Sequence, residues 1–433
     1  MADAFLVKGL NGAKKLSGNL RVNGSKNAAL PALALPFLFS DGVILENMPV
    51  LEDIYRVEEL LQSLGVSLKK PKPRRYELVA ENTHKTALSS DIAKRLRASI
   101  LFTGPILARF GSVSFPHTGG CVIGERPIDL FLEGFKKMGA RIDEKDGMYC
   151  LRAPKNGLNG ANIFFRTQSV TAAETFLMTA VLARGKTVLQ NVPVEPEIGE
   201  LISFLNSCGA KISGAETHRL EIDGGGLLRA NRAVYTIIPD RIEAGSFLIL
   251  AALVGKKITI TRCNPEHVGS VIEHLRSSGV DITIGKDTIT IVAPKSKQAL
   301  LFYKSIPLKT HEYPGFPTDL QAPMAVFLTQ TEGEALVFET IFEGRLGYVH
   351  ELVRMGARIQ DMGPHRVYVQ GKTALRGKEL KSPDLRAGLA FIIAALVAKG
   401  ESIVHNAYSI DRGYEKIEKR LQKIGVPIKR ISL

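Results

Sequence analysis

The sequence repeats one unit of about 70 residues six times, and this repetition constrains the fold more than any other feature. Each copy carries a short string in which a helix end, a glycine and the start of a strand follow one another. The strings are SLGVSL (63–68), KMGARI (137–142), SCGAKI (207–212), SSGVDI (277–282), RMGARI (354–359) and KIGVPI (423–428). A unit of this size cannot bury its hydrophobic face alone, so neighbouring units must cover one another.

A second series of glycines stands before the first, one in each copy. It consists of Gly42, Gly111, Gly185, Gly255, Gly333 and Gly400. An apolar stretch of helical length precedes each one, such as AGLAFIIAALVAK before Gly400, and its near-continuous hydrophobicity predicts a buried helix. A strand-like run follows, and then a charged amphipathic helix such as EKIEKRLQKIG (415–425). Glycines at these helix ends suit the left-handed position just after a helix.

Each unit therefore reads helix, strand, helix, strand, usually with a further strand such as TITIV (288–292). Strands joined through helices imply right-handed crossover connections. Six units in 433 residues exceed what one core holds, and two domains of three units fit better than a solenoid. The sequence predicts an α/β protein of two domains.

The charge balance narrows the choice of partner. The formal net charge is +14, from 57 Lys and Arg against 43 Asp and Glu, and 45% of the residues are hydrophobic, which predicts a folded chain. A positive balance suits nucleic acid, an acidic membrane face or small anionic substrates. The sequence has no zinc finger, RNP-type aromatic motif or long basic arm, so we expect small anions and no nucleic acid.

Neither a membrane span nor an export signal is expected. The longest apolar run (389–398) is shorter than the roughly 18 residues that a span requires, and MADAFLVKGLNGAKK at the start lacks the apolar region of a signal peptide. Cys121, Cys150, Cys208 and Cys263 are widely spaced and match neither a zinc pattern nor a disulfide framework. We expect free thiols in a reducing cytoplasm.

Aligning the repeats on the second glycine series places charged residues where the buried helices start. These residues are Lys26, Arg97, Arg241, Asp319 and Arg386, with Thr171 in the third repeat; Glu197, Arg345 and Arg412 fall near the starts of second helices. Helix N-termini carry unpaired N–H groups and partial positive charge, so a cation there adds charge to charge unless an anion binds. The set predicts an anion-binding pocket, although each arginine taken singly suits a surface salt bridge.

Two positions depart from the repeat pattern. The second repeat is lengthened within FPHTGGCVIGERPID (115–129), which places Cys121 near Arg126 in a loop. Thiols in such surroundings tend to be reactive, although most lone cysteines are inert. Asp319 is acidic where its counterparts are basic or neutral, and it is either a helix N-cap residue or a proton acceptor beside the cations.

Seven motifs, in order along nearly the whole chain, resemble the UDP-N-acetylglucosamine 1-carboxyvinyltransferase family of enolpyruvyl transferases. They are SKNAALP (25–31), LRAS (96–99), GGCVIGERPIDL (119–130), PDRIE (239–243), FPTDLQA (316–322), DLRAG (384–388) and DRGYEKIE (411–418). The resemblance implies a two-domain inside-out α/β barrel of six βαβαββ units. Residues 22–234 would form the first domain with the Cys121 loop, and residues 1–21 and 235–433 the second domain with Asp319 and Arg412.

The resemblance also implies a reaction. The enolpyruvyl group of phosphoenolpyruvate passes to the 3′-hydroxyl of UDP-N-acetylglucosamine and phosphate is released, by addition and elimination. Cys121 would protonate the methylene carbon, Asp319 would deprotonate the attacking hydroxyl, and Arg412 completes the catalytic set. The residues that the resemblance implies for substrate binding are Lys26, Asn27, Arg97, Arg126, Pro127, Ile128, Asp129, Leu130, Ser169, Asp319, Ile341 and Arg386. No cofactor or metal is implied.

The sequence departs from the family pattern at two places. FPHTGGC is longer than the commoner Pro-Gly-Gly-Cys form, and RTQSVTAAET (166–175) keeps Ser169 but lacks the Gly-Ala-Thr that usually follows Val170. Two other functions stay open: transfer to shikimate 3-phosphate, and a non-catalytic paralogue that binds nucleotide sugars. We expect a cytoplasmic, monomeric enzyme of the first committed step of peptidoglycan synthesis, with no membrane partner, and a target of fosfomycin.

Overall fold

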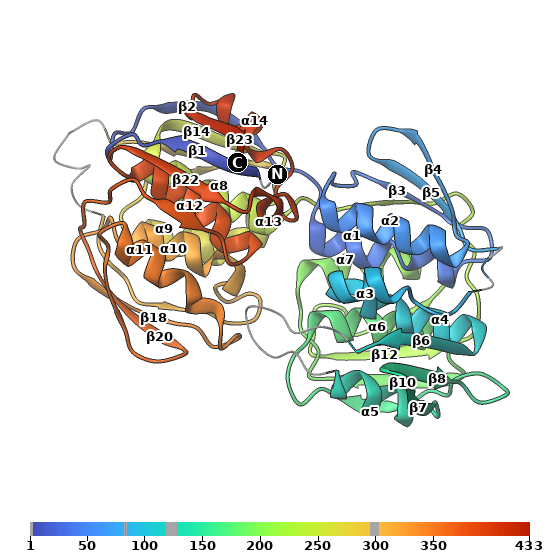
Figure 1. The fold of residues 1–433 in the computed structure, drawn as a ribbon. Coiled ribbons are helices and arrows are strands. Elements are labelled where there is room, and N and C mark those ends of the chain that lie inside the picture. The colour runs from blue at the N-terminus through green and yellow to red at the C-terminus, as the bar shows by residue number, and fades with distance from the viewer. Residues whose placement is uncertain (1–2, 82, 84, 118–127, 295–302) are drawn as a thin grey trace. The chain divides into compact units, whose positions relative to one another are not determined.

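The computed structural model describes residues 3–81, 83, 85–117, 128–294 and 303–433 (Figure 1). Their contacts divide them into two compact units. The terminal unit contains the described residues before 24 and those from 239 onward, and the central unit contains the described residues between 24 and 238. Each unit has its own hydrophobic core. Both ends of the chain therefore belong to the same unit.

The strands form six sheets, five of four strands and one of three. The central unit contains β3 (Val43–Glu46), β4 (Ser67–Lys72), β5 (Arg75–Val79), β6 (Ser112–Pro116), β7 (Arg141–Lys145), β8 (Met148–Arg152), β9 (Asn162–Phe164), β10 (Gly185–Gln190), β11 (Lys211–Ser213), β12 (Arg219–Gly224) and β13 (Val234–Thr236). The terminal unit contains β1 (Asp3–Lys8), β2 (Leu16–Arg21), β14 (Gly255–Thr261), β15 (Ile282–Ile284), β16 (Thr288–Val292), β17 (Leu308–Lys309), β18 (Glu334–Phe338), β19 (Arg358–Asp361), β20 (Arg366–Gln370), β21 (Glu379–Lys381), β22 (Glu401–His405) and β23 (Ile428–Ser432).

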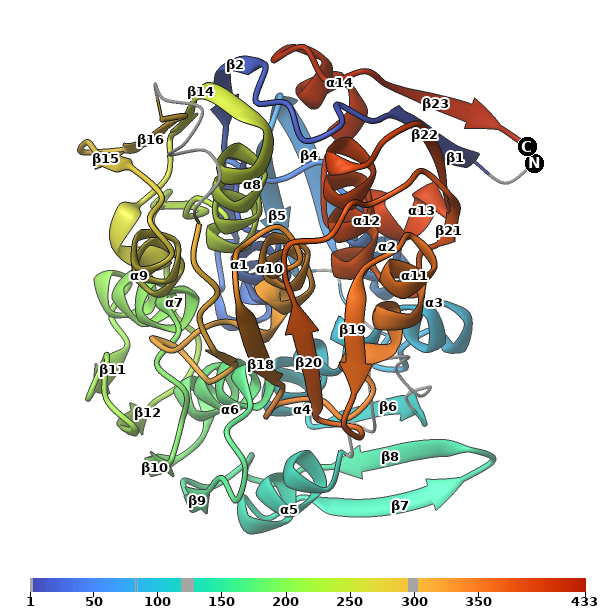
Figure 2. The same ribbon diagram turned by 90° about the vertical axis from the view of Figure 1, so that its left-hand side faces the viewer.

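All five four-stranded sheets have the same order of pairings: one parallel pair, followed by two antiparallel pairs. In Figure 2, for example, β18, β20 and β19 run side by side, and β17 pairs with β18 in parallel. The three-stranded sheet, β6-β8-β7, follows the same order once the isolated parallel bridge between Ala87 and Ser114 is included. Each sheet is thus one repeat.

The N-terminal strands complete two sheets of the terminal unit. β1 pairs antiparallel with both β22 and β23, and β2 pairs in parallel with β14. Figure 1 shows β1, at the blue end of the colour scale, beside the red strands β22 and β23. Among the described residues the six sheets stay separate and no hydrogen-bonded barrel closes. Each unit therefore places separate sheets around its helices, and within the described ranges no sheet is hydrogen-bonded to the next.

Helices fill the interior of each unit. The central unit has α1 (Lys26–Ala32), α2 (Glu52–Leu64), α3 (Ser90–Arg95), α4 (Thr103–Phe110), α5 (Asp129–Lys137), α6 (Val170–Leu182) and α7 (Pro196–Ser207), with short 3-10 turns η1 (Leu35–Leu38) and η2 (Arg97–Phe102). The terminal unit has α8 (Arg241–Val254), α9 (Gly269–Ser277), α10 (Gln321–Leu328), α11 (Val349–Arg354), α12 (Leu385–Val397), α13 (Ala407–Asp411) and α14 (Ile417–Gln422), with η3 (Pro265–Val268), η5 (Thr318–Leu320) and η6 (Arg345–Tyr348).

The predicted division into buried and amphipathic helices is confirmed. Every residue of α8 after Arg241 and every residue of α12 after Leu385 is buried. By contrast, α2 alternates buried and exposed residues, as an amphipathic helix on the surface of a core does. Within the described residues, no helix is both long and apolar enough to cross a membrane.

The first glycine series takes the left-handed conformation throughout, as predicted: φ lies between 89° and 104° at all six positions. In the second series Gly255 is the exception, with φ of −76°. The difference arises because α8 ends at Val254 and β14 begins at Gly255 itself, so the chain enters the strand without a left-handed turn. Cys150, Cys208 and Cys263 are free thiols, also as predicted.

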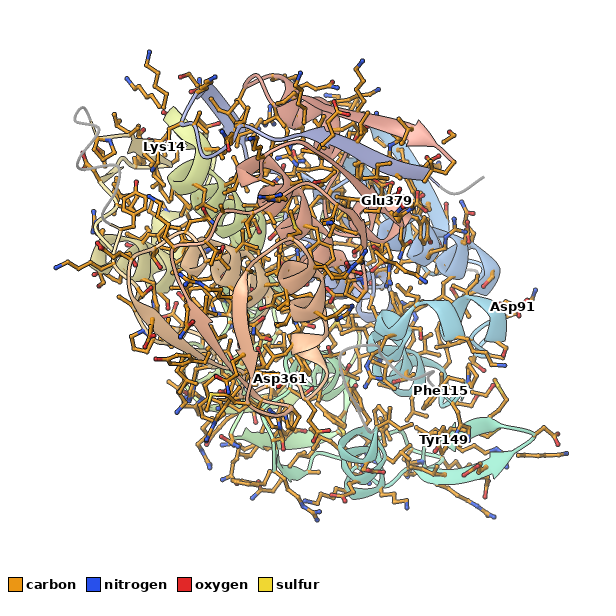
Figure 3. The ribbon with its side chains drawn as sticks, turned by 60° about the vertical axis from the view of Figure 1, so that its left-hand side comes forward. Lys14, Asp91, Phe115, Tyr149, Asp361 and Glu379 are labelled. Atoms are coloured by element: carbon orange, nitrogen blue, oxygen red, sulfur yellow. The ribbon has the colours of Figure 1, made fainter. Side chains whose placement is uncertain are left out.

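Strand β6 leads into the segment that carries Cys121. Phe115 of β6 pairs in register with Tyr149 of β8, and their ring centroids are 5.6 Å apart (Figure 3). Just beyond the strand, the His117 ring stacks on Tyr149 with centroids 4.4 Å apart. His117, the described residue directly before 118, is therefore held against the sheet by aromatic packing.

Close approach of α4 and α6 gives a first testable prediction. A Cβ at Gly104 would lie 2.0 Å from Oγ1 of Thr179 and 2.9 Å from Cγ2 of Thr175. Gly104→Ala should therefore lower the free energy of unfolding by about 1–3 kcal/mol, measured by urea denaturation. The matched control is Gly199→Ala in α7, whose nearest contact is 4.0 Å away, and it should gain about 0.5–1 kcal/mol. Equal effects of the two substitutions would contradict this packing.

Candidate functional site

Asp319, Arg345 and Arg386, here called the Asp319 cluster, form a set of ion pairs in the terminal unit. Asp319 lies in η5, Arg345 begins η6, and Arg386 is the second residue of α12. Arg345 Nη2 lies 2.5 Å from Asp319 Oδ1, and Arg386 Nη2 lies 3.3 Å from Asp319 Oδ2. The two oxygens of one carboxylate thus face guanidinium groups from two different segments.

The Asp319 cluster is largely enclosed. Both arginine side chains are 4% exposed, and the Asp319 side chain is 25% exposed. Burial by itself raises the pKa of Asp319, but the charges of Arg386 and Arg345, the hydrogen bond from Arg345 and the charge of Arg241 hold that pKa well below its usual range. Burial likewise disfavours the charged form of Arg386, but the charge of Asp319 outweighs it and raises the pKa of Arg386. Asp319 and Arg386 are therefore both charged at neutral pH.

Positive charge is in excess in the Asp319 cluster, because two guanidinium groups share one carboxylate. Within the described part of the chain, Nη1 of Arg386 is buried and makes no hydrogen bond. A buried, charged donor without an acceptor is unfavourable. A phosphate or carboxylate oxygen would satisfy it, and guanidinium groups suit both. The charges and the unsatisfied donor of the Asp319 cluster are thus suited to an anion beside a carboxylate.

The motif DLRAG explains how α12 presents Arg386. Asp384 is the N-cap of this helix, and its Oδ1 accepts hydrogen bonds from the backbone N–H groups of Arg386 (2.8 Å) and Ala387 (3.1 Å). The helix that follows is fully buried, so its start is held rigidly. The Arg386 guanidinium also lies over the Tyr414 ring, 5.5 Å from the centroid.

Lys26 in the central unit is also paired with a carboxylate. It is the first residue of α1, after the N-cap Ser25, and its Nζ lies 2.6 Å from Oδ2 of Asp53 in α2. The two side chains are 9% and 7% exposed, and Asn27 beside them is half-buried. Sequence reasoning did not single out Asp53, which lies in an ordinary amphipathic helix.

The other predicted residues of the central unit that the structure describes also lie at helix starts, although the repeat alignment indicates only Arg97 among them. Arg97 begins η2, which packs against both α1 and α6. Ser169 is the N-cap of α6, and its hydroxyl accepts from Ala172 N at 3.3 Å. At the start of α5, Ile128 is buried, Asp129 exposed and Leu130 half-buried. η2 thus contacts both the helix that begins with Lys26 and the helix that Ser169 caps.

The remaining predicted residues lie either in the terminal unit or outside the described residues. Cys121, Arg126 and Pro127 lie outside the described residues. Arg412 directly follows α13, and Ile341 lies in the connection from β18 to η6. Of the predicted residues in the terminal unit, Asp319 and Arg386 form an ion pair. The repeat alignment includes Arg345 in the predicted anion pocket, but it does not predict that Arg345 is the nearer partner of Asp319.

Within the described ranges, no group of three or more His, Cys, Asp or Glu side chains is arranged to hold a metal ion. The polar groups assembled around Asp319 are instead cations and one carboxylate. Such a set can bind an oxyanion and accept a proton next to it.

The chain is similar to proteins of known name along its whole length. It is 42% identical over 433 residues to the UDP-N-acetylglucosamine 1-carboxyvinyltransferase of Koribacter versatilis, covering 99% of this chain and 97% of that protein. It is 43% identical to the enzyme of the same name from Acidobacterium capsulatum, covering 99% and 96%.

Solved structures share the fold at lower identity. The enolpyruvyl transferase NikO from Streptomyces tendae aligns with a TM-score of 0.87 at 22% identity, covering 100% of this chain and 99% of that one. EPSP synthase from Acinetobacter baumannii aligns with a TM-score of 0.76 at 18% identity, covering 99% and 100%. The predicted enolpyruvyl transferase fold is thereby confirmed.

Residues 10–421 match the family described as EPSP synthase (3-phosphoshikimate 1-carboxyvinyltransferase). This match spans more than nine-tenths of the 433 residues and includes the Asp319 cluster, Lys26 and Arg412. Together with the full-length relatives, it shows that the chain belongs to the EPSP synthase family of enolpyruvyl transferases.

Proposed function

We propose that this protein transfers the enolpyruvyl group of phosphoenolpyruvate to the 3′-hydroxyl of UDP-N-acetylglucosamine with release of phosphate, the first committed step of peptidoglycan synthesis. Relatives of that name, 41–43% identical along nearly the whole chain, support this acceptor. The carrying observation is the Asp319 cluster, which holds a proton acceptor beside two buried guanidinium groups that are suited to an anion.

The proposed chemistry depends on how strong a base the Asp319 carboxylate is. While Arg345 and Arg386 both pair with it, its low pKa makes it a weak base. An anionic substrate group that binds these arginines weakens their hold on Asp319, so the pKa of Asp319 rises toward the range where it accepts a proton. Substrate binding and activation of the base are thus coupled through the same two side chains.

The proposed reaction proceeds by addition and elimination. The sugar hydroxyl oxygen attacks C2 of phosphoenolpyruvate, its proton passes to Asp319, and Cys121 supplies a proton to C3. Removal of a proton from C3 then restores the double bond as phosphate leaves C2. Cys121, Asp319 and Arg412 form the proposed catalytic set.

The proposed binding residues divide by ligand. Lys26, Arg126 and Arg412 hold phosphoenolpyruvate with Asn27, because its phosphate and carboxylate require cations. The nucleotide sugar is assigned to Arg97, Arg126, Pro127, Ile128, Asp129, Leu130, Ser169, Asp319 and Ile341, with Arg386 organising the site. We further propose that the two compact units are the two domains, and that the enzyme acts as a cytoplasmic monomer without a cofactor.

A second candidate acceptor is shikimate 3-phosphate. The description of the matching family names it, and EPSP synthase from Acinetobacter baumannii shares the fold. The loop cysteine in GGCVIGERPIDL favours the nucleotide sugar. A third candidate is a non-catalytic paralogue that binds nucleotide sugars. Any measured turnover would exclude this candidate.

The choice of acceptor is tested by phosphate release. With phosphoenolpyruvate present, we expect phosphate release with UDP-N-acetylglucosamine and none with shikimate 3-phosphate. Phosphate release only with shikimate 3-phosphate would overturn the proposed acceptor, and no release with either would support the paralogue.

The proposed role of Cys121 predicts covalent labelling. Fosfomycin should alkylate the Cys121 thiol in enzyme saturated with UDP-N-acetylglucosamine, and intact-mass spectrometry should show one adduct. Cys121→Ala should show none, while Cys150→Ala, which removes a half-buried thiol of β8, should still be labelled. An unmodified wild-type protein under saturation counts against a reactive thiol in the site.

Removal of the Asp319 carboxylate should affect both turnover and stability. Asp319→Asn leaves Arg345 and Arg386 buried without a counter-charge, so we expect no phosphate release and a loss of about 3 kcal/mol of unfolding free energy at pH 7. Added inorganic phosphate should restore more stability to the variant than to the wild type. Asp143→Asn, which removes an exposed ion pair, should cost less than about 0.5 kcal/mol. Near-normal turnover of Asp319→Asn would show that Asp319 is not the base.

The same ion pairs set a pH dependence. The folded-state pKa of Asp319 lies below the unfolded value of about 4. Its contribution to stability is therefore complete above about pH 4 and is lost only as the pH falls through the lower folded-state value. The difference in unfolding free energy between wild type and Asp319→Asn should stay constant from pH 7 down to about pH 5 and shrink in more acidic solution. A difference that shrinks already between pH 7 and pH 6 would contradict the assigned shift.

A further inference from the structure

Glu339 directly follows β18 and is fully buried, with 0% of its surface exposed. Its carboxylate accepts three hydrogen bonds. Oε1 accepts from the backbone N–H groups of Ile341 (2.9 Å) and Phe342 (3.2 Å), and Oε2 accepts from the hydroxyl of Thr318 (3.0 Å). All three partners act as donors to the carboxylate oxygens.

Two of these hydrogen bonds, those from Thr318 and Phe342, lead to the Asp319 cluster. Thr318 is the neighbour of Asp319 in η5. Phe342 connects to Arg345 in two ways: its backbone oxygen accepts from Arg345 N at 3.3 Å, and its ring lies 5.9 Å from the Arg345 guanidinium. One buried side chain thereby links the turn that holds Asp319 to the turn that starts η6 with Arg345.

The backbone on both sides of this carboxylate is itself fixed. Glu339 N donates to His365 O at 2.8 Å, and Glu339 O lies 2.9 Å from His365 Nδ1. The next residue, Thr340, is bonded twice to Thr310: its N–H donates to Thr310 Oγ1 at 2.9 Å, and its hydroxyl donates to Thr310 O at 2.6 Å. The backbone that carries the Glu339 carboxylate is therefore held in place. The carboxylate can in turn fix the positions of the groups that donate hydrogen bonds to it.

Other buried glutamates of the terminal unit have different surroundings. Glu351 of α11 pairs with Arg354, whose side chain is 55% exposed. Glu243 of α8 pairs with Arg420 and accepts from Asn23 N. Among the buried glutamates of the described terminal unit, Glu339 is the one that accepts hydrogen bonds from both the turn of Asp319 and the turn before Arg345.

We propose that Glu339 is a positioning residue for the transfer reaction, acting through Thr318 on Asp319 and through residues 341 and 342 on Arg345 and the nucleotide-sugar contact at Ile341. This inference rests on the proposed function, because Asp319 and Ile341 have their roles only there. Glu339 does not touch the reacting atoms. Its hydrogen bonds fix the turn that carries Asp319 relative to the turn that starts η6 with Arg345.

The test compares two substitutions of similar size. Glu339→Leu removes all three hydrogen bonds without leaving a large cavity, whereas in Glu339→Gln the amide oxygen can accept from residues 341 and 342 and the amide N–H can donate to Thr318. We expect kcat per folded molecule to fall about 100-fold in Glu339→Leu, with a raised KM for UDP-N-acetylglucosamine. Glu339→Gln should stay within about tenfold of wild type.

Two further variants separate positioning from folding. Thr318→Val cuts only the link to Asp319, so it should lower kcat and raise the KM for UDP-N-acetylglucosamine less than Glu339→Leu does. Glu351→Gln is the matched control, a buried glutamate without these links, and its kcat should equal that of wild type. The folded fraction of each variant is measured by thermal unfolding, so that kcat refers to folded enzyme only.

The outcomes are distinguishable. Glu339→Leu with wild-type kcat per folded molecule, or Glu339→Gln as impaired as Glu339→Leu, overturns the positioning role. A wild-type enzyme that releases no phosphate with UDP-N-acetylglucosamine contradicts the proposed function instead. Combining Thr318→Val with Glu339→Leu should cost less than the two separate losses together, because both act on Asp319 through one hydrogen bond.

Discussion

The fold depends on helices that are apolar on all sides. α8 and α12 bury almost every residue, and such helices are stable only when sheets and other helices cover them completely. Each repeat meets this requirement by placing one sheet outside and one apolar helix inside. The start of each inner helix is then one of the few places where a polar side chain can stay, and the site residues come from those starts.

This constraint explains why the sequence predicts the fold so fully. Apolar runs, glycine spacing and strand-like runs are local signals, and they locate the inner helices, the left-handed helix ends and the six sheets. The exceptions have local causes as well: Gly255 enters β14 directly, and the parallel strand of the second repeat is reduced to one bridge at Ala87. The separate sheets could not be foreseen, because closure of a barrel depends on pairing between repeats.

Prediction of the candidate site was less complete, for a different reason. The repeat alignment indicates Asp319, Arg386 and Lys26 one residue at a time, but their partners lie on other segments. Asp53 lies in an amphipathic helix where carboxylates are common, and Glu339 follows a strand and resembles any strand-end residue. Neither has a spacing that sets it apart. Their roles follow from contacts across 20 residues or more, which the sequence alone does not display.

Both units keep a buried cation beside a carboxylate: Lys26 with Asp53, and Arg386 with Asp319. A buried cation without any counter-charge would destabilise the fold, so these carboxylates stabilise the protein when no substrate is bound. The same pairing means that an anionic substrate must compete with an internal carboxylate for each cation. In the mechanism that we propose, this competition at the Asp319 cluster makes the carboxylate a better base, because an anion that binds the arginines weakens their hold on Asp319. A chain with a net charge of +14 could attract anions anywhere on its surface, but the proposed catalytic effect requires cations that are already paired with a carboxylate.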